Sequence, residues 1–161
     1  MDKIIRVGIA DWKLARRPEA LRTSGLGSCV AVVIYDSSTG LAAMAHIMLP
    51  NHELTKQANF SFAKFADTAI PALVDILLKK GAYIGRLKAK IAGGAEMFRS
   101  RKGFTSGIGK RNVAVAKEYL KQYKIPIISE DTGGDYGRTI EFFTETDMMC
   151  VRSIKRGERM I

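Results

Sequence analysis

Residues 29–49 are CVAVVIYDSSTGLAAMAHIML, two apolar runs on either side of a short polar segment. The first run, 29–36, is rich in β-branched residues and shows no alternation, as expected of a strand that is buried on both faces. The polar segment 36–40 has the composition of a turn, and the second run, 41–49, ends immediately before Pro50. This stretch therefore predicts a β-hairpin.

Hydrophobic periodicity predicts the remaining elements. Residues 4–10 alternate weakly and indicate a strand, followed by a polar, Arg-rich loop that ends near Pro18. Apolar residues follow the helical period from 61 to 80, and Gly81 is placed to end that helix. Pro71 lies inside the pattern and is expected to kink the helix or split it in two. The other expected elements are a strand over 87–94, a helix over 109–123, a strand over 125–131, a loop over 131–137 and a final hairpin from 138 to 154. The mixture predicts an α+β sandwich, with sheet on one side and helices on the other.

Length and composition limit the class of protein. The chain has 161 residues, of which 47% are hydrophobic and 26% are charged, and it contains no internal repeat or linker. We therefore expect one domain over residues 1–161. The formal charge of +10, from 26 Lys and Arg against 16 Asp and Glu, predicts a positive surface and an acidic partner.

No apolar stretch is long enough for a signal-peptide core or a membrane span, so we expect no membrane insertion. The two cysteines, Cys29 and Cys150, are too few for a disulfide scaffold or a metal knuckle. Two free thiols fit a reducing cytoplasm.

Cys29 and His46 are the candidate reactive residues. If the hairpin loop is Asp36–Thr39, Cys29 stands directly opposite His46, with Cβ atoms about 4.5–5.5 Å apart on one face of the sheet. A five-residue loop would shift the register by one and place the two side chains on opposite faces.

The pair has two interpretations. In the first, an imidazolium at His46 lowers the pKa of the Cys29 thiol and makes it a nucleophile. The glycines Gly25 and Gly27 then allow a tight turn whose bare N–H groups, near Ser28, can hold an oxyanion. In the second, Cys29 is a small buried residue and His46 a core histidine bonded to a carbonyl. Spacing alone leaves both open.

Several longer motifs resemble one family. They are TSGLGSCVAV (23–32), AAMAHIMLP (42–50), AKIAGGAEMF (89–98), IGKRNV (108–113) and EDTGGDYGRTIEF (130–142). In this order they are similar to the CheD family, the chemoreceptor glutamine deamidases of bacterial chemotaxis, from about residue 4 to residue 152. The resemblance implies that Cys29 is the nucleophile, that His46 is its partner and that Thr23 supports the histidine. Thr23 could instead be a turn residue that caps the GLG loop.

The family also implies a fold, an activity and partners. The implied fold is a three-layer α/β/β sandwich, similar to the catalytic domains of cytotoxic necrotizing factor toxins. The implied activity is hydrolysis, through a thioester, of glutamine side chains on the cytoplasmic helices of methyl-accepting chemotaxis receptors. A CheC-type phosphatase is the implied regulator, and no metal or organic cofactor is needed.

Two other functions compete with the enzyme. A non-catalytic basic module could hold an acidic chemotaxis partner such as a CheC-type phosphatase, with Cys29 only packing. A nucleic-acid binder is suggested by charge alone, because no recognition motif or aromatic stacking surface accompanies the charge. Under the enzyme interpretation, the basic face of helix 109–123 is expected to help dock acidic receptor helices. Its cations are Lys110, Arg111, Lys117 and Lys121.

Overall fold

The computed structural model describes residues 3–97 and 107–161, which form two five-stranded sheets and two α-helices. The first sheet has the order β1–β3–β8–β9–β10, with β1 (Ile4–Arg6), β3 (Ala20–Leu26), β8 (Arg138–Phe143), β9 (Met148–Ser153) and β10 (Gly157–Met160). The second has the order β2–β5–β4–β6–β7, with β2 (Trp12–Arg16), β5 (Leu41–Ile47), β4 (Val30–Asp36), β6 (Lys88–Gly93) and β7 (Ile127–Thr132). The helices are α1 (Ala66–Lys79) and α2 (Ile108–Gln122), and the short 3₁₀ turns are η1 (His52–Leu54), η2 (Phe62–Lys64) and η3 (Ile84–Arg86).

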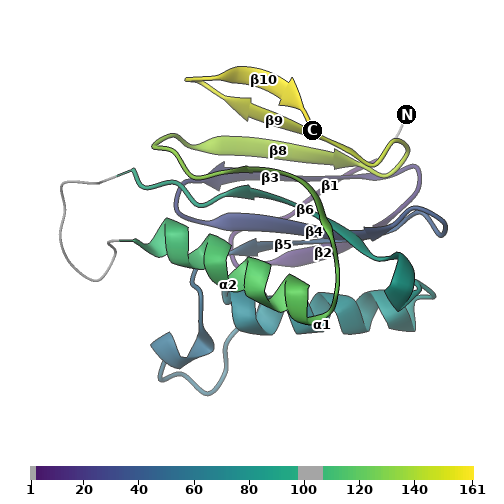
Figure 1. Cartoon of the computed structure of the whole chain (residues 1–161), viewed down its shortest axis with the longest axis horizontal. Helices are drawn as coiled ribbons and strands as arrows, with labels where there is room; N and C mark the ends of the chain where they lie inside the picture. Colours follow the sequence, from purple (N-terminus) through teal and green to yellow (C-terminus); the bar gives the residue numbers. More distant parts are fainter. Residues whose placement is uncertain (1–2, 98–106) are drawn as a thin grey trace.

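The molecule has three layers. Figure 1 shows α1 and α2 along one side of the second sheet, with the first sheet on the other side. One apolar cluster fills the space between the helices and the second sheet, and another fills the space between the two sheets. The α+β class is confirmed, and the three layers agree with the α/β/β sandwich that the family resemblance implied. Periodicity alone predicted sheet on one side and helices on the other, without showing that the sheet side holds two sheets.

The surroundings of strand β4 explain why its residues do not alternate between apolar and polar. Val30, Val32 and Ile34 belong to the cluster under the helices. Ala31 and Val33 belong to the cluster between the sheets. Both faces of the strand exclude water, so every position is apolar. The expected strands over 29–36 and 41–49 are thus confirmed as β4 and β5, and all seven residues of each are buried.

The register of this hairpin differs from the one predicted. Asp36 pairs with Leu41, so the loop is Ser37–Gly40 and Ala31, not Cys29, lies opposite His46. The side chain of Asp36 sets the loop, because it accepts hydrogen bonds from the backbone N–H groups of Ser38 (2.9 Å) and Tyr83 (3.0 Å). The loop therefore begins one residue later than expected, and the register moves by two.

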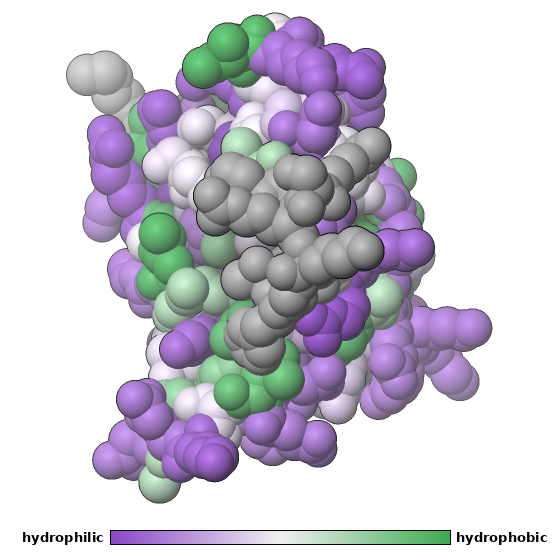
Figure 2. Space-filling model, turned by 90° about the vertical axis from the view of Figure 1, so that its left-hand side faces the viewer, coloured by the Kyte–Doolittle hydropathy of each residue, from purple (hydrophilic) through white to green (hydrophobic). Residues whose placement is uncertain are grey.

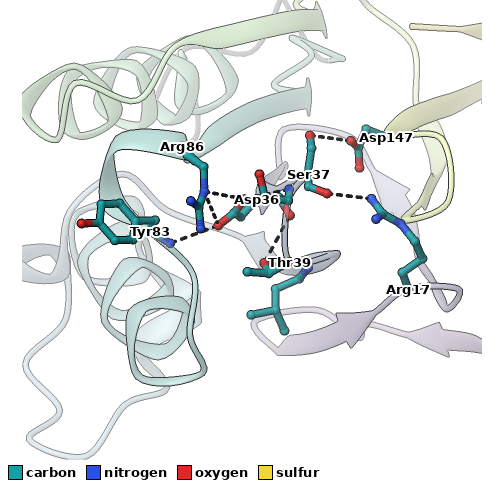
Figure 3. Close-up of polar contacts among 9 residues, drawn as sticks. Arg17, Asp36, Ser37, Thr39, Tyr83, Arg86 and Asp147 are labelled. Atoms are coloured by element: carbon teal, nitrogen blue, oxygen red, sulfur yellow. Dashed lines mark hydrogen bonds and ion pairs between the residues drawn. The ribbon is translucent and has the colours of Figure 1, made fainter.

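Figure 3 shows the polar contacts around this loop. Arg86 Nε lies 3.4 Å from the Asp36 carboxylate. Ser37 ties the loop to the first sheet: its hydroxyl donates to Asp147 Oδ2 (2.6 Å), and its carbonyl accepts from Arg17 (3.0 Å). The two sheets are thus joined at the end of the hairpin that lies farthest from Cys29.

The sequence-based prediction misplaced or missed four strands, β1, β2, β3 and β10. The expected strand over 4–10 stops at Arg6, and the predicted Arg-rich loop contains β2 and leads into β3. Strand β10 has four exposed residues. β2 and β10 are edge strands, where charged residues are tolerated because one side pairs with nothing. Their polar composition concealed them.

Helix α1 is continuous through Pro71, so the predicted split was wrong, and the helix begins at Ala66 after the separate turn η2. Pro71 is the sixth residue of the helix and removes one backbone donor. Burial of the apolar face outweighs that loss; it consists of Ala66, Ala69, Ile70, Leu73, Val74 and Leu77. Gly81, with φ of 109°, follows the helix end as predicted. The helix over 109–123 is confirmed as α2.

Asp36→Asn is expected to lower the free energy of unfolding by about 1 to 3 kcal/mol near neutral pH, because charge-assisted bonds to a buried carboxylate are lost. Burial alone would raise the pKa of Asp36, but the N–H groups of Tyr83 and Ser38 and the Arg86 guanidinium outweigh it and lower that pKa. The contribution is therefore complete above the ordinary carboxyl pKa and is lost as the pH falls through the lowered value.

Urea unfolding at neutral and at acid pH measures this effect. The control is Asp75→Asn, which removes an exposed ion pair with Lys79 and should change stability by less than about 0.5 kcal/mol. A deficit for Asp36→Asn that does not shrink in acid would contradict the assignment.

Candidate active site

Three predicted residues come from three adjacent segments of the two sheets. Cys29 immediately precedes β4, His46 is in β5, and Thr23 is in β3 of the other sheet. Cys29 and Ala31 both pack against the apolar cluster between the sheets, and Ala31 is the partner of His46 across the strands. Cys29 is therefore a diagonal neighbour of His46 on the same face of the sheet.

A hydrogen bond between Thr23 of the first sheet and His46 of the second sheet orients the His46 ring. Thr23 Oγ1 lies 2.7 Å from His46 Nδ1 and 2.7 Å from the carbonyl oxygen of Val7. The carbonyl can only accept, so the single hydroxyl proton goes to Val7. Thr23 must then accept from the ring, and Nδ1 carries the proton. This excludes a role for Thr23 as a turn cap only, and it leaves Nε2 as the basic nitrogen.

His46 is fully buried, and its Nε2 has no hydrogen-bond partner among residues 3–97 and 107–161. Burial lowers the pKa of His46 and raises the pKa of the partly exposed Cys29 thiol. The expectation of an imidazolium that lowers the thiol pKa is thus not met. Desolvation disfavours both charged forms, which favours a neutral thiol and a neutral imidazole.

The loop before Cys29 is held from one side through its carbonyl groups. Three consecutive carbonyls accept hydrogen bonds of 2.9 Å: Gly27 from Ala95 N–H, Ser28 from Asn112 Nδ2 and Cys29 from Gly94 N–H. The carbonyl groups of this loop are therefore all engaged within the protein.

The N–H groups of the loop differ from one another. Gly27 N–H donates to the carbonyl of Gly25 (3.1 Å), so the prediction that this N–H is available to a ligand was wrong. Within the described parts of the chain, the N–H groups of Ser28 and Cys29 donate to no backbone carbonyl and to no side chain of another residue. These two form the candidate oxyanion site. Gly25, with φ of 71°, lies in a bulge of β3 that turns the chain toward this loop.

Gly93 and Gly94 serve close packing behind the loop. A Cβ on Gly93 would collide with the carbonyl oxygen of Cys29, and one on Gly94 would collide with Val113. Both glycines have positive φ. The pair forms a tight turn whose Gly94 N–H donates to the carbonyl of Cys29.

Asn112 is the residue of the site that the sequence analysis missed. It is fully buried in α2, and its Nδ2 donates to the carbonyls of Ser28 (2.9 Å) and Met48 (3.0 Å). It thereby joins the loop of Cys29 to the chain that leaves β5 after His46. The buried stripe of α2 recurs at Ile108, Asn112, Ala116 and Leu120. A polar residue on such a stripe was the indication available in the sequence.

The other histidine and the other cysteine lie apart from this site. His52 is hydrogen-bonded to Asp67 (2.6 Å) at the start of α1, and Cys150 is buried in β9. Of the described residues, no three His, Cys, Asp or Glu side chains are grouped so that they could hold a metal ion. No helix in the described ranges is long and apolar enough to cross a membrane.

Comparison with known proteins supports the motif resemblance. A family model, described as CheD chemotactic sensory transduction, matches residues 48–153. This chain belongs to the CheD family. The family member from Bacillus velezensis named chemoreceptor glutamine deamidase CheD is 51% identical over 98% of this chain and 96% of its own length. CheD relatives of the same name from Bacillus subtilis and Halalkalibacterium halodurans are 50% and 46% identical, covering 98% and 100% of this chain and 96% and 100% of their own.

Among solved structures, that of the Bacillus licheniformis hypothetical protein YfiH is similar to this CheD chain with a TM-score of 0.49 at 15% identity. The similarity covers 81% of this chain and 59% of YfiH.

Nitrogen-15 NMR of the His46 ring should show a protonated Nδ1 and an unprotonated Nε2. Its titration midpoint should lie below the ordinary histidine value because burial lowers the pKa. His52→Gln simplifies the spectrum by removing the other histidine. Thr23→Val should abolish the tautomer preference, and a wild-type ring protonated at Nε2 would contradict the hydrogen-bond assignment.

Asn112→Leu should destabilise the protein by about 2 to 4 kcal/mol, because two partly buried carbonyls lose their donor. Urea unfolding measures the change. Lys121→Leu, on the exposed face of the same helix, should stay within about 0.5 kcal/mol of wild type. Equal stability of Asn112→Leu and wild type would show that the two bonds do not hold the loop.

Proposed function

We propose that this protein hydrolyses glutamine side chains of chemoreceptors to glutamate and releases ammonia. The observation that carries the proposal is the Nε2 of His46, which has no partner among the described residues, is held in its basic form by Thr23 and lies on the face that Cys29 shares. Relatives about 50% identical over nearly the whole chain are named chemoreceptor glutamine deamidases. The chemistry is acyl transfer by a cysteine nucleophile.

In the first step, Cys29 Sγ attacks the carbon of the glutamine amide, and the thiol proton passes to His46 Nε2. General-base activation of this kind suits a neutral pair, because no thiolate has to exist beforehand. The negative charge moves to the amide oxygen. The N–H groups of Ser28 and Cys29 would stabilise it, each such donor contributing about 3 to 4 kcal/mol in comparable sites.

In the second step, the tetrahedral intermediate collapses to a thioester. His46 Nε2 returns its proton to the amide nitrogen, and ammonia leaves as the carbon–nitrogen bond breaks. Water then attacks the thioester carbon while Nε2 accepts one of its protons. Breaking of the carbon–sulfur bond releases glutamate, and the proton on Nε2 restores the thiol.

Thr23 acts through His46 in this scheme. By accepting from Nδ1–H, its hydroxyl keeps Nε2 unprotonated at rest, and it stabilises the imidazolium that forms in each step. A neutral hydroxyl takes the place that a carboxylate occupies in other triads. Because the hydroxyl also donates to Val7, its lone pair stays directed at the ring.

Finer points of the proposal rest on the family resemblance. They are a fold like that of the catalytic domains of cytotoxic necrotizing factor toxins, a single domain over residues 1–161, action in the cytoplasm on receptor helices, and regulation by a CheC-type phosphatase. No described residue is assigned to the phosphatase.

Cys29→Ala should fold normally and lose deamidation by at least about a thousandfold, the scale of loss when a covalent nucleophile is removed. Purified protein is incubated with receptor cytoplasmic fragments, and ammonia release and the amide-to-acid mass change are followed peptide by peptide. The matched control is Cys150→Ala, which removes the other thiol and should retain activity. Full activity of Cys29→Ala would overturn the mechanism and favour a non-catalytic basic module.

A further inference from the structure

A groove of about 980 Å³ opens at one end of the first sheet, beside the loop of Cys29. Its walls come from the bulge of β3, the beginning of β8 and the hairpin formed by β9 and β10. No step of the proposed mechanism uses it. Its position raises the question of what lies in it while Cys29 reacts.

The groove borders the catalytic loop on two sides. Gly25, in its wall, is four residues before Cys29 and belongs to the bulge that leads into the loop. Met97, also in its wall, packs so closely on Gly27 that a Cβ there would lie 2.9 Å from its sulfur. A chain lying in the groove would therefore pass next to the residues that present Cys29.

Apolar side chains stand exposed along the groove. Ile154, at the turn between β9 and β10, is 108% exposed relative to a reference isoleucine, and Met97 is 48% exposed. Figure 2 looks onto this end of the molecule and shows hydrophobic atoms among hydrophilic ones at its top, where Figure 1 places the hairpin. An isolated exposed isoleucine is unremarkable in itself. Two exposed apolar side chains that share a groove offer a place for an apolar side chain of a partner.

The hairpin also carries strong positive charge. Residues 152–159 are RSIKRGER, four cations and one carboxylate. Arg152 bonds to Glu158 (2.9 Å) and Lys155 to Asp135 (2.7 Å), both as exposed pairs. Exposed ion pairs stabilise a protein by only about 1 kcal/mol or less, so these cations can pair with carboxylates of a partner at a small cost in free energy. Arg156 lies over the Tyr136 ring, 5.5 Å from its centre.

We propose that this groove docks the receptor segment beside the target glutamine. The segment would place an apolar side chain against Ile154 and Met97 and acidic side chains toward the β9–β10 hairpin. This inference rests on the proposed function and names its substrate-docking surface. It assigns the attraction of an acidic receptor to the hairpin, which lines the groove, rather than to the basic face of α2, whose residues do not line it.

The test measures binding separately from catalysis. In the Cys29→Ala background, which cannot turn over substrate, the dissociation constant for a receptor cytoplasmic fragment is measured by calorimetry. Ile154→Asp should raise it about tenfold or more, as expected for an apolar contact residue replaced by a charge. The matched control is Ile84→Asp, also an exposed isoleucine (44%), in η3 and outside the groove.

The charge on the hairpin is tested in the same way. Lys155→Glu together with Arg156→Glu should weaken binding and reduce its dependence on salt, because fewer charges attract the partner. Lys121→Glu, on α2, is the control. In all groove variants with Cys29 intact, the rate of Cys29 alkylation by iodoacetamide should match wild type, which shows that the site itself is unaltered.

The outcomes separate the two proposals. Unchanged binding by Ile154→Asp, or an equal loss for Ile84→Asp or Lys121→Glu, overturns the groove as the docking surface. Selective weakening by the groove variants supports it. A wild-type protein that binds the fragment through the groove but releases no ammonia refutes the deamidase function and leaves the docking surface standing.

Discussion

The pairing of β4 with β5 is the constraint on which the rest of the structure depends. These strands are buried on both faces, so their register decides which side chains meet the helices and which meet the first sheet. Pairing of Asp36 with Leu41 directs Ala31 and His46 toward the first sheet. A shift by one residue would turn His46 toward the helices, away from Thr23. The buried carboxylate of Asp36, bonded to two backbone N–H groups, makes such a shift costly.

The site exists only because two sheets face each other. Cys29 and His46 belong to segments of the second sheet, and Thr23 belongs to the first. The bond between Thr23 and His46 fixes the tautomer, so the basic nitrogen of the site is a product of the packing between layers. The third layer contributes as well, because Asn112 of α2 holds the loop of Cys29 by donating a hydrogen bond to the carbonyl of Ser28. Each of the three layers thus controls a different atom of the proposed chemistry.

Sequence patterns predicted the helices and the central hairpin well, but they missed two edge strands, β2 and β10, and the inner strand β3. An apolar run such as 29–36 indicates a buried strand wherever it lies, because no other environment removes all its side chains from water. Trp12–Arg16 and Gly157–Met160 are edge strands whose polar residues are equally compatible with a loop. The same limit concealed Asn112, since its hydrogen bonds reach residues 64 and 84 positions away in the sequence.

The sequence by itself determined the α+β class, the central hairpin, both helices and the family, and its motifs pointed to Cys29, His46 and Thr23. Those features depend on residue type and local periodicity, which a linear chain displays directly. Only the tertiary structure decided the diagonal placement of Cys29, the protonated Nδ1 of His46 and the neutral character of the pair. A register depends on which loop a buried carboxylate stabilises, and a tautomer and a pKa depend on partners and burial. The partners and the burial come from segments that are far apart in the sequence and meet only when the sheets pack.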